Sequence, residues 1–203
     1  MSDTAEPSIW ATYNAAQSDR AVRPLCLEVI ELAGPGNGRT AIDLGCGLGR
    51  ETDALLGAGW RTHAVDWEEG TRANLTASTA REHRERLTIQ IAGFAELADL
   101  PGADLVYSGY SLPYIAPEDF ARLWGVLRAA LRPGAWCAVN LLGDRDSYAQ
   151  TETGTYTFLP EPEARALFDG MELVKFEVED RDGNAFGGPK HWHLYNVIAR
   201  LPE

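Results

Sequence analysis

Residues 41–50 read Ala-Ile-Asp-Leu-Gly-Cys-Gly-Leu-Gly-Arg, an apolar run that reaches an acidic residue and then turns on alternating glycines. The pattern predicts a buried strand over Thr40–Leu44 that passes through a glycine loop into a helix. Glycine has no Cβ, so Gly45, Gly47 and Gly49 can adopt positive φ and let a ligand approach the backbone. Because the first N–H groups of a helix lack partners within it, the loop predicts a nucleotide-type binding site.

Two classes of ligand fit such a loop. The dinucleotide fingerprint is G-x-G-x-x-G, whereas the spacing here is G-x-G-x-G with Asp43 two residues before the first glycine. A carboxylate at Asp43 repels a pyrophosphate but accepts hydrogen bonds from an ammonium group, which favours S-adenosylmethionine. Asp66 ends the next apolar run and can hold ribose hydroxyls in either class, so it supports an adenosine ligand without choosing between the two.

Composition limits the remaining possibilities. The 203 residues, of which 45% are hydrophobic, suit a single domain over residues 1–203. No apolar run is long enough to span a bilayer, and the composition of the first residues leads us to expect no signal peptide. Three widely spaced cysteines indicate reduced thiols and a cytoplasmic protein. A net charge of −12 without a basic cluster argues against a nucleic-acid partner.

The rest of the chain predicts an α/β fold. Five strands alternate with helices, and two further strands follow without a helix between them, which predicts an antiparallel pair. The turn between these two strands is expected over residues 182–184 and 187–189, where glycine, asparagine and proline gather. Residues 1–33 are expected to form a flap and a helix over the pocket. The whole pattern predicts a three-layer Rossmann-like sandwich around a mainly parallel sheet.

The element order and the glycine loop resemble class I S-adenosylmethionine-dependent methyltransferases over essentially the whole chain. A closer likeness is to the small bacterial group of tellurite-resistance-type methyltransferases. It is carried by Ser108-Gly-Tyr-Ser-Leu-Pro-Tyr114, Leu131-Arg-Pro-Gly134, Leu141-Leu-Gly-Asp-Arg-Asp-Ser-Tyr148 and Lys190-His-Trp-His-Leu-Tyr-Asn-Val-Ile-Ala-Arg200. The resemblance implies seven strands in the order 3-2-1-4-5-7-6, with strand 7 antiparallel and strands 3 and 6 at the edges.

The resemblance also implies the cofactor contacts. It places the methionine end of the cofactor on Asp43, Gly45 and Gly47. Cys46, in the same loop, and Ser108 are further candidate cofactor-binding residues. It places the ribose on Asp66 and the adenine near Trp67 and Phe94. One departure stands out, because the family usually offers an aspartate after the third strand and this chain has Gly93-Phe94 there.

Three residues are candidates for acceptor contact or catalysis. His191 lies in the last strand and is a candidate general base. Arg145 follows the fifth strand in a polar loop and is a candidate anion clamp. Tyr110 is a candidate pocket residue. His191 and His193 lie two residues apart in an expected strand, but no third ligand is close in sequence, so no metal site is expected.

Taken together, the sequence predicts a methyltransferase that uses S-adenosylmethionine on a small-molecule acceptor by in-line displacement, as a monomer or homodimer. A protein that binds S-adenosylmethionine without turnover is one alternative, and an NAD-type oxidoreductase is a weaker one. The acceptor stays open between a chalcogen oxyanion, which the resemblance suggests, and a thiol, a carboxylate or another metabolite.

Overall fold

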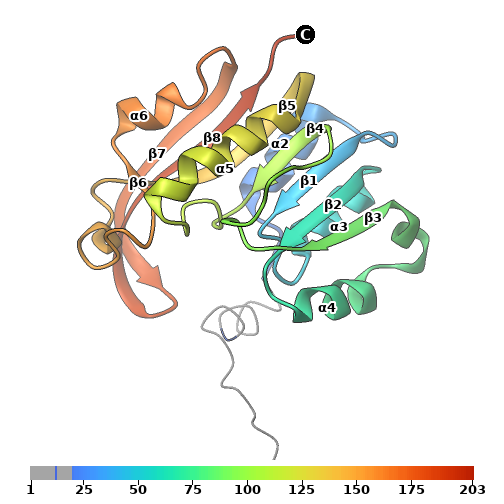
Figure 1. Ribbon diagram of the computed structural model, residues 1–203, viewed down its shortest axis with the longest axis horizontal. Helices are drawn as coiled ribbons and strands as arrows, with labels where there is room; N and C mark the ends of the chain where they lie inside the picture. Colours follow the sequence, from blue (N-terminus) through green and yellow to red (C-terminus); the bar gives the residue numbers. More distant parts are fainter. Residues whose placement is uncertain (1–11, 13–19) are drawn as a thin grey trace, which may run out of the picture.

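The computed structural model describes residue 12 and residues 20–203, which form an eight-stranded mixed sheet with helices on both faces (Figure 1). The strands are β1 Thr40–Leu44, β2 Arg61–Asp66, β3 Leu87–Ile91, β4 Ala103–Ser108, β5 Leu131–Gly143, β6 Phe158–Leu159, β7 Glu172–Ala185 and β8 Gly188–Arg200. The helices are α2 Pro24–Ala33, α3 Arg50–Gly57, α4 Gly70–Ser78, α5 Pro117–Ala130 and α6 Glu161–Ala166, with 3-10 turns η1 Arg81–Arg86 and η2 Ser147–Gln150. Within the predicted flap, residues 1–11 and 13–19 lie outside the described part.

The strand order is β3-β2-β1-β4-β5-β8-β7, with the short strand β6 paired beside β5. Strand β8 runs antiparallel to β5 and to β7, while the strands β1 to β5 are parallel to one another. Because β6 is an additional two-residue strand, β7 and β8 are the sixth and seventh strands of the prediction. The predicted order and the predicted edge strands are therefore confirmed.

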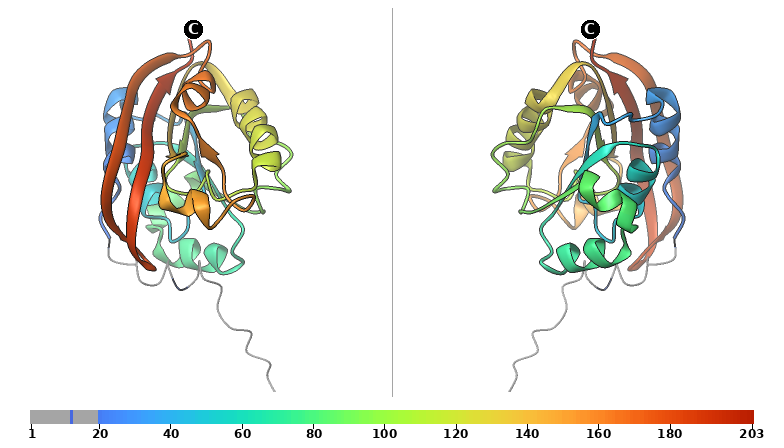
Figure 2. Two further views of the ribbon diagram at one scale, coloured as in Figure 1. Left: turned by 90° about the vertical axis from the view of Figure 1, so that its left-hand side faces the viewer. Right: turned by 90° about the vertical axis from the view of Figure 1, so that its right-hand side faces the viewer.

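The two faces of the sheet are covered by different helices, as Figure 2 shows. Side chains alternate along a strand, so Ile42 and Leu44 of β1 face a core that also contains the apolar stripe of α5 and part of α6. Ala41 faces the opposite way, into a second core with α2 and α3. The predicted three-layer sandwich is confirmed.

The hairpin of β7 and β8 differs from the prediction. Pairing continues in register to Ala185 and Gly188, so the turn consists of residues 186–187 and residues 182–184 belong to the strand. A cross-strand pair explains the extension, because Asp182 lies opposite His191 and its carboxylate contacts Nδ1 at 2.8 Å. The turn residues were recognised, but this pairing competes with their tendency to end a strand.

The sheet reverses its strand order between β1 and β4, which lie side by side although β2 and β3 come between them in sequence. In open α/β sheets, ligands bind outside the carboxyl ends of the strands at such a point. The loops after β1, β2 and β4 meet there. No helix in the described part of the chain is long and apolar enough to cross a membrane.

Candidate active site

The glycine loop leaves β1 at Leu44 and enters α3 at Arg50. Gly45, Gly47 and Gly49 have φ of 75°, 53° and 82°, so the expected positive φ is confirmed at all three. A Cβ on Gly45 would lie 2.3 Å from the Cβ of Ser111. The loop therefore requires glycine at this position for space as well as for backbone conformation.

The carboxylate of Asp66 holds this loop at the end of β2. Its Oδ2 accepts a hydrogen bond from the N–H of Gly47 at 2.8 Å, and its Oδ1 accepts one from the N–H of Glu68 at 3.0 Å. Burial raises the pKa of Asp66, while these hydrogen bonds oppose the rise. Asp66 therefore fixes the glycine loop relative to β2 and lines the cavity beside it.

Asp43 is the most deeply buried acid of the site. Its carboxylate is 1% exposed and accepts a hydrogen bond from Oγ1 of Thr52 at 2.6 Å. Burial raises the pKa of Asp43 to about 7, and the nearby charge of Glu51 adds to the rise. A buried carboxylate with a raised pKa is stabilised in its charged form by a cation, so Asp43 is suited to an ammonium group.

Glu51 lies next to this carboxylate and binds the segment that leads into α2. Both of its oxygens accept from the Arg20 guanidinium, at 2.5 and 2.6 Å, and the backbone N–H of Arg23 donates to Oε1 at 3.0 Å. Burial alone would raise the pKa of Glu51, but these hydrogen bonds lower it. The carboxylate is therefore charged and matched to Arg20.

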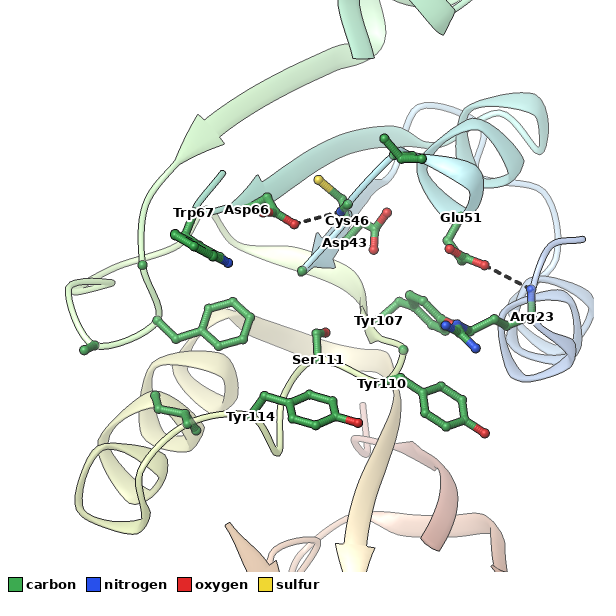
Figure 3. Close-up of a pocket in the computed structure, with 18 of the residues that line it drawn as sticks. Arg23, Asp43, Cys46, Glu51, Asp66, Trp67, Tyr107, Tyr110, Ser111 and Tyr114 are labelled. Carbon is green, nitrogen blue, oxygen red and sulfur yellow. Dashed lines mark hydrogen bonds between the residues drawn. The ribbon is translucent and has the colours of Figure 1, made fainter. Parts of the chain in front are cut away.

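A cavity of about 440 Å³ lies over these residues (Figure 3). Trp67 lines it near Asp66, while Tyr110 and Arg23 line the part near Glu51. Phe94 also lines the cavity. Its volume lies within the range of about 300–1,000 Å³ that is typical of small-molecule sites. It is therefore large enough for a nucleoside-sized ligand.

Arg122 of α5 fixes the loop that carries Phe94. Its guanidinium donates to the carbonyl oxygens of Phe94, Ala95 and Leu97 at 2.7, 2.7 and 2.6 Å. Three hydrogen bonds from one cationic side chain determine the course of this loop. The sequence analysis did not single out Arg122, because an arginine on an amphipathic helix carries no signal of such a role.

A second cavity of about 590 Å³ adjoins the first between the β7–β8 hairpin and the loops near Tyr110 and Tyr148. Arg23, Tyr110 and Tyr114 line both cavities. Six of the fourteen residues that line the second cavity are aromatic: Tyr110, Tyr114, Tyr148, Tyr156, Phe186 and Trp192. It is named the aromatic cavity below.

Tyr110 stands between the two cavities in an unusual backbone conformation. Its φ is 54°, a left-handed value that a bulky side chain rarely adopts. Its N–H donates to Oδ1 of Asn140 at 3.2 Å, and Nδ2 of Asn140 donates to Oδ1 of Asn196 at 2.6 Å. Buried hydrogen bonds in the sheet thus hold a strained tyrosine at the boundary, and such strain is often found at functional sites.

The sequence-predicted residues fall into two groups. Seven of the eight predicted cofactor residues line the first cavity: Asp43, Gly45, Cys46, Gly47, Asp66, Trp67 and Phe94. The eighth, Ser108, is fully buried beneath it, where its Oγ donates to the Leu44 carbonyl oxygen at 3.1 Å and contacts the Ser111 Oγ at 2.8 Å. Ser111, three residues later, lines the cavity instead.

Of the three predicted catalytic residues, the structure brings only Tyr110 to the cavities. Arg145 donates to Oδ2 of Asp180 at 3.0 and 2.7 Å, and His191 contacts Asp180 and Asp182 at 2.8 Å each. Hydrogen bonds to Asp182 and Asp180 raise the pKa of His191. The partners of Arg145 and His191 belong to the hairpin, which the polar loop pattern did not reveal.

The cavity over the glycine loop fits S-adenosylmethionine on its own geometry. Gly45 leaves room that a side chain would fill, and Asp43 offers a buried carboxylate to an ammonium group. Asp66 carries carboxylate oxygens at the end of β2, where a ribose is held in related sheets. The N–H groups of Gly45 and Cys46 donate to the Val65 carbonyl oxygen at 2.8 and 3.1 Å, so they are not directed at a pyrophosphate.

Solved structures of similar fold come from several methyltransferases. TehB from Haemophilus influenzae has a TM-score of 0.74 at 14% identity, over 93% of this chain and 65% of TehB, so the chain spans about two thirds of that protein's length. The 1,6-didemethyltoxoflavin-N1-methyltransferase of Burkholderia thailandensis has a TM-score of 0.68 at 22% identity, over 96% of this chain and 84% of the other. An S-adenosylmethionine-dependent methyltransferase from Methanosarcina mazei has a TM-score of 0.65 at 18% identity, over 91% and 100%.

Sequence comparison agrees with the fold. Residues 42–137 match a family model described as a methyltransferase domain, while no curated protein matches the chain. The matched segment runs from β1 into β5 and includes the glycine loop and Asp66. The cofactor that such a domain implies is S-adenosylmethionine. Residues 42–137 therefore resemble a methyltransferase domain, and the chain has the fold of the class I S-adenosylmethionine-dependent methyltransferases.

Proposed function

We propose that the protein transfers the methyl group of S-adenosylmethionine to a small-molecule acceptor bound in the aromatic cavity. The observation that carries the proposal is the shared wall of the two cavities, where Arg23, Tyr110 and Tyr114 line both. Two ligands that touch the same three side chains can approach each other closely. Methyl transfer needs this arrangement, because the reacting atoms must come within about 3–3.5 Å of each other.

The bound cofactor supplies an electrophilic methyl group on a sulfonium. Asp43 would hold its ammonium group, Asp66 would accept hydrogen bonds from the ribose, and Trp67 and Phe94 would flank the adenine. The aromatic side chains around the acceptor exclude water from the transfer.

The two rivals are weakened by different observations. An NAD-type oxidoreductase needs loop N–H groups for a pyrophosphate, yet those of Gly45, Cys46 and Gly47 donate to Val65 and Asp66. A protein that only binds the cofactor has no use for a second cavity sharing three wall residues with the first. The three cysteines are free and buried, in keeping with a cytoplasmic location.

Calorimetry with S-adenosylhomocysteine and NAD tests the cofactor assignment. We expect micromolar-range binding of S-adenosylhomocysteine and no binding of NAD, and the reverse order would overturn the proposal. A panel of phenols, thiols, carboxylic acids, amines and chalcogen oxyanions then tests turnover, followed as S-adenosylhomocysteine formed. Cofactor binding without turnover across the whole panel would favour the non-catalytic alternative.

A further inference from the structure

We propose that the acceptor bound in the aromatic cavity carries an ammonium group, and that the carboxylate of Glu152 binds this group. The inference rests on the proposed function and adds the chemical class of the acceptor. Glu152 is thus a specificity-determining residue and takes no part in the bonds that methyl transfer makes and breaks. Three observations support it: the place of Glu152 in the cavity wall, a carboxylate that no described residue neutralises, and the aromatic rings beside it.

Glu152 lies in the wall of the aromatic cavity, in a segment that also reaches the cofactor side. Thr155, three residues later, lines the first cavity, and Tyr156 lines the aromatic one. The backbone N–H of Glu152 donates to the Tyr148 carbonyl oxygen at 2.8 Å. The Glu152 carbonyl oxygen accepts from the N–H groups of Thr155 and Tyr156 at 3.0 and 3.1 Å. The backbone that carries this side chain is therefore fixed close to the boundary of the two cavities.

The carboxylate of Glu152 has neither a hydrogen bond nor an ion pair with any residue that the structure describes. The other residues of the chain, 1–11 and 13–19, include no lysine, arginine or histidine. Glu152 is half-buried, and a carboxylate that loses part of its hydration without a partner is in an unfavourable position. A cationic ligand removes this cost when it binds.

The second acid of the cavity, Glu179, is in a different situation. It accepts a hydrogen bond from Nδ2 of Asn196 at 2.7 Å and forms an ion pair with Arg181 at 3.0 Å. Arg181 also lines the cavity, so the charges of this pair neutralise each other. Glu179 is therefore not available to a ligand cation in the way that Glu152 is.

Two further cations lie near the cavity and are directed elsewhere. Lys190 forms a buried ion pair with Asp146. The Arg23 guanidinium lies 4.3 Å from the ring centre of Tyr110, and its charge acts on Glu51 in the first cavity. Neither cation forms an ion pair with the remaining carboxylate of the aromatic cavity.

The rings beside Glu152 also favour a cation. Burial raises the pKa of Tyr148 and of Tyr156, and the charge of Glu152 contributes to both shifts, so the carboxylate lies near both phenols. Aromatic ring faces attract cations, and the Lys190 ammonium already lies 3.8 Å from the ring centre of Tyr148. A ligand ammonium is therefore stabilised by the carboxylate and by the rings, whereas an anion is repelled by the carboxylate.

The test uses the full-length protein saturated with S-adenosylhomocysteine, after binding of that ligand has been measured by itself. Calorimetric titrations at neutral pH compare 2-phenylethylammonium with 2-phenylethanol, which has the same ring and chain but a neutral hydroxyl, and with the anion 3-phenylpropanoate. We expect 2-phenylethylammonium to bind about 10-fold or more tighter than 2-phenylethanol, as one charge-assisted hydrogen bond predicts. The anion should bind more weakly than either.

Two variants separate Glu152 from the overall charge of the protein. The net charge is −12, so every cation is attracted to some extent. Glu152→Gln keeps the size of the side chain and should bring the ratio of the ammonium and alcohol affinities close to one. Glu163→Gln removes the same charge from the exposed surface of α6, outside both cavities, and should leave the ratio unchanged.

The outcomes distinguish this inference from the proposed function. Equal binding of the ammonium and the alcohol, no binding of the ammonium, or tighter binding of the anion would overturn the inference and leave the proposed function standing. A ratio that Glu152→Gln does not lower, or that both variants lower equally, would also overturn it. Absence of S-adenosylhomocysteine binding would instead overturn the proposed function itself.

Discussion

The backbone N–H of Tyr110 donates a hydrogen bond to Oδ1 of Asn140 at 3.2 Å, and this contact supports a tyrosine with φ of 54°. A non-glycine residue in such a conformation costs on the order of 1–3 kcal/mol. The cost is met by a buried pair of asparagines, since Asn140 also donates to Asn196 in the neighbouring strand. The aromatic ring between the two cavities is therefore positioned from the centre of the sheet.

Asn140→Leu should disturb the acceptor side of the site and leave the cofactor side intact. The change keeps the approximate size of the side chain but removes the acceptor of the Tyr110 N–H and the donor to Oδ1 of Asn196, whose Nδ2 still donates to Glu179. A loss of about 1–3 kcal/mol in the free energy of unfolding is expected. KM for the acceptor should rise while S-adenosylhomocysteine affinity stays within about twofold. Unchanged acceptor kinetics would show that Tyr110 keeps its place without Asn140.

Gly45→Ala should abolish cofactor binding. A Cβ at this position would lie 2.3 Å from Ser111, and φ of 75° is unfavourable for alanine. Gly125→Ala is the matched control, because Gly125 lies within α5 with open space around the position of a Cβ. That control should gain about 0.5–1 kcal/mol of stability and bind normally. Normal calorimetric binding by Gly45→Ala would contradict the close packing of the loop.

Asp43→Asn should stabilise the ligand-free protein at neutral pH and weaken cofactor binding. The ordinary pKa of the carboxyl is 3.8, and burial raises the pKa of Asp43 to about 7 in the folded protein. Between these values the folded state keeps a proton that the unfolded state has released, so the stability contributed by Asp43 falls as pH rises through this window.

Thermal unfolding between pH 4 and pH 8 measures this effect. The Tm of the variant should exceed that of the wild type most at pH 8, and this difference should shrink toward pH 4. Each kcal/mol of difference in stability should shift Tm by roughly 2–4 °C. S-adenosylhomocysteine affinity at pH 8 should fall, because the amide offers no charge to the ammonium group. A difference in Tm that is independent of pH would contradict the raised pKa.

Asp66→Ala should weaken S-adenosylhomocysteine binding by roughly 10- to 1,000-fold, through the loss of one or two charge-assisted hydrogen bonds to the ribose. Part of the loss comes from the glycine loop, because the Gly47 N–H also loses its acceptor. Glu163→Ala, which removes an exposed carboxylate of α6, should bind as the wild type does. Wild-type affinity in Asp66→Ala would show that the ribose is held elsewhere.

Arg145→Ala and His191→Ala should leave S-adenosylhomocysteine affinity unchanged. Both residues pair with Asp180 on the hairpin and neither lines a cavity, so acceptor kcat/KM should change by less than about twofold, as exposed ion pairs contribute little. Kinetics with any turned-over acceptor of the panel provide the measurement. A large fall in kcat/KM for either variant would restore the catalytic role that the sequence suggested.

The sequence predicted those parts of the fold that depend on local patterns. Glycines with positive φ, an acid at the end of each of two neighbouring strands and the order of helices and strands are all visible along the chain. Ser111 and Asn140 were missed because their roles come from partners far away in sequence, at Leu44 and Asn196. The positions of Arg145 and His191 depend on how far the hairpin extends, and cross-strand pairing determines that extent.

The two cavities draw on different parts of the chain. Most residues that line the first cavity lie within the segment that matches the methyltransferase domain. Of the residues that line the aromatic cavity, only Tyr110 and Tyr114 lie in that segment. The hairpin and the 148–156 loop supply most of the other side chains of the aromatic cavity. Exchange of these two segments for those of another protein of the same fold should therefore transfer acceptor preference as a module. The cofactor site should still bind S-adenosylmethionine after such an exchange. The same cofactor site can therefore be combined with cavities for different acceptors.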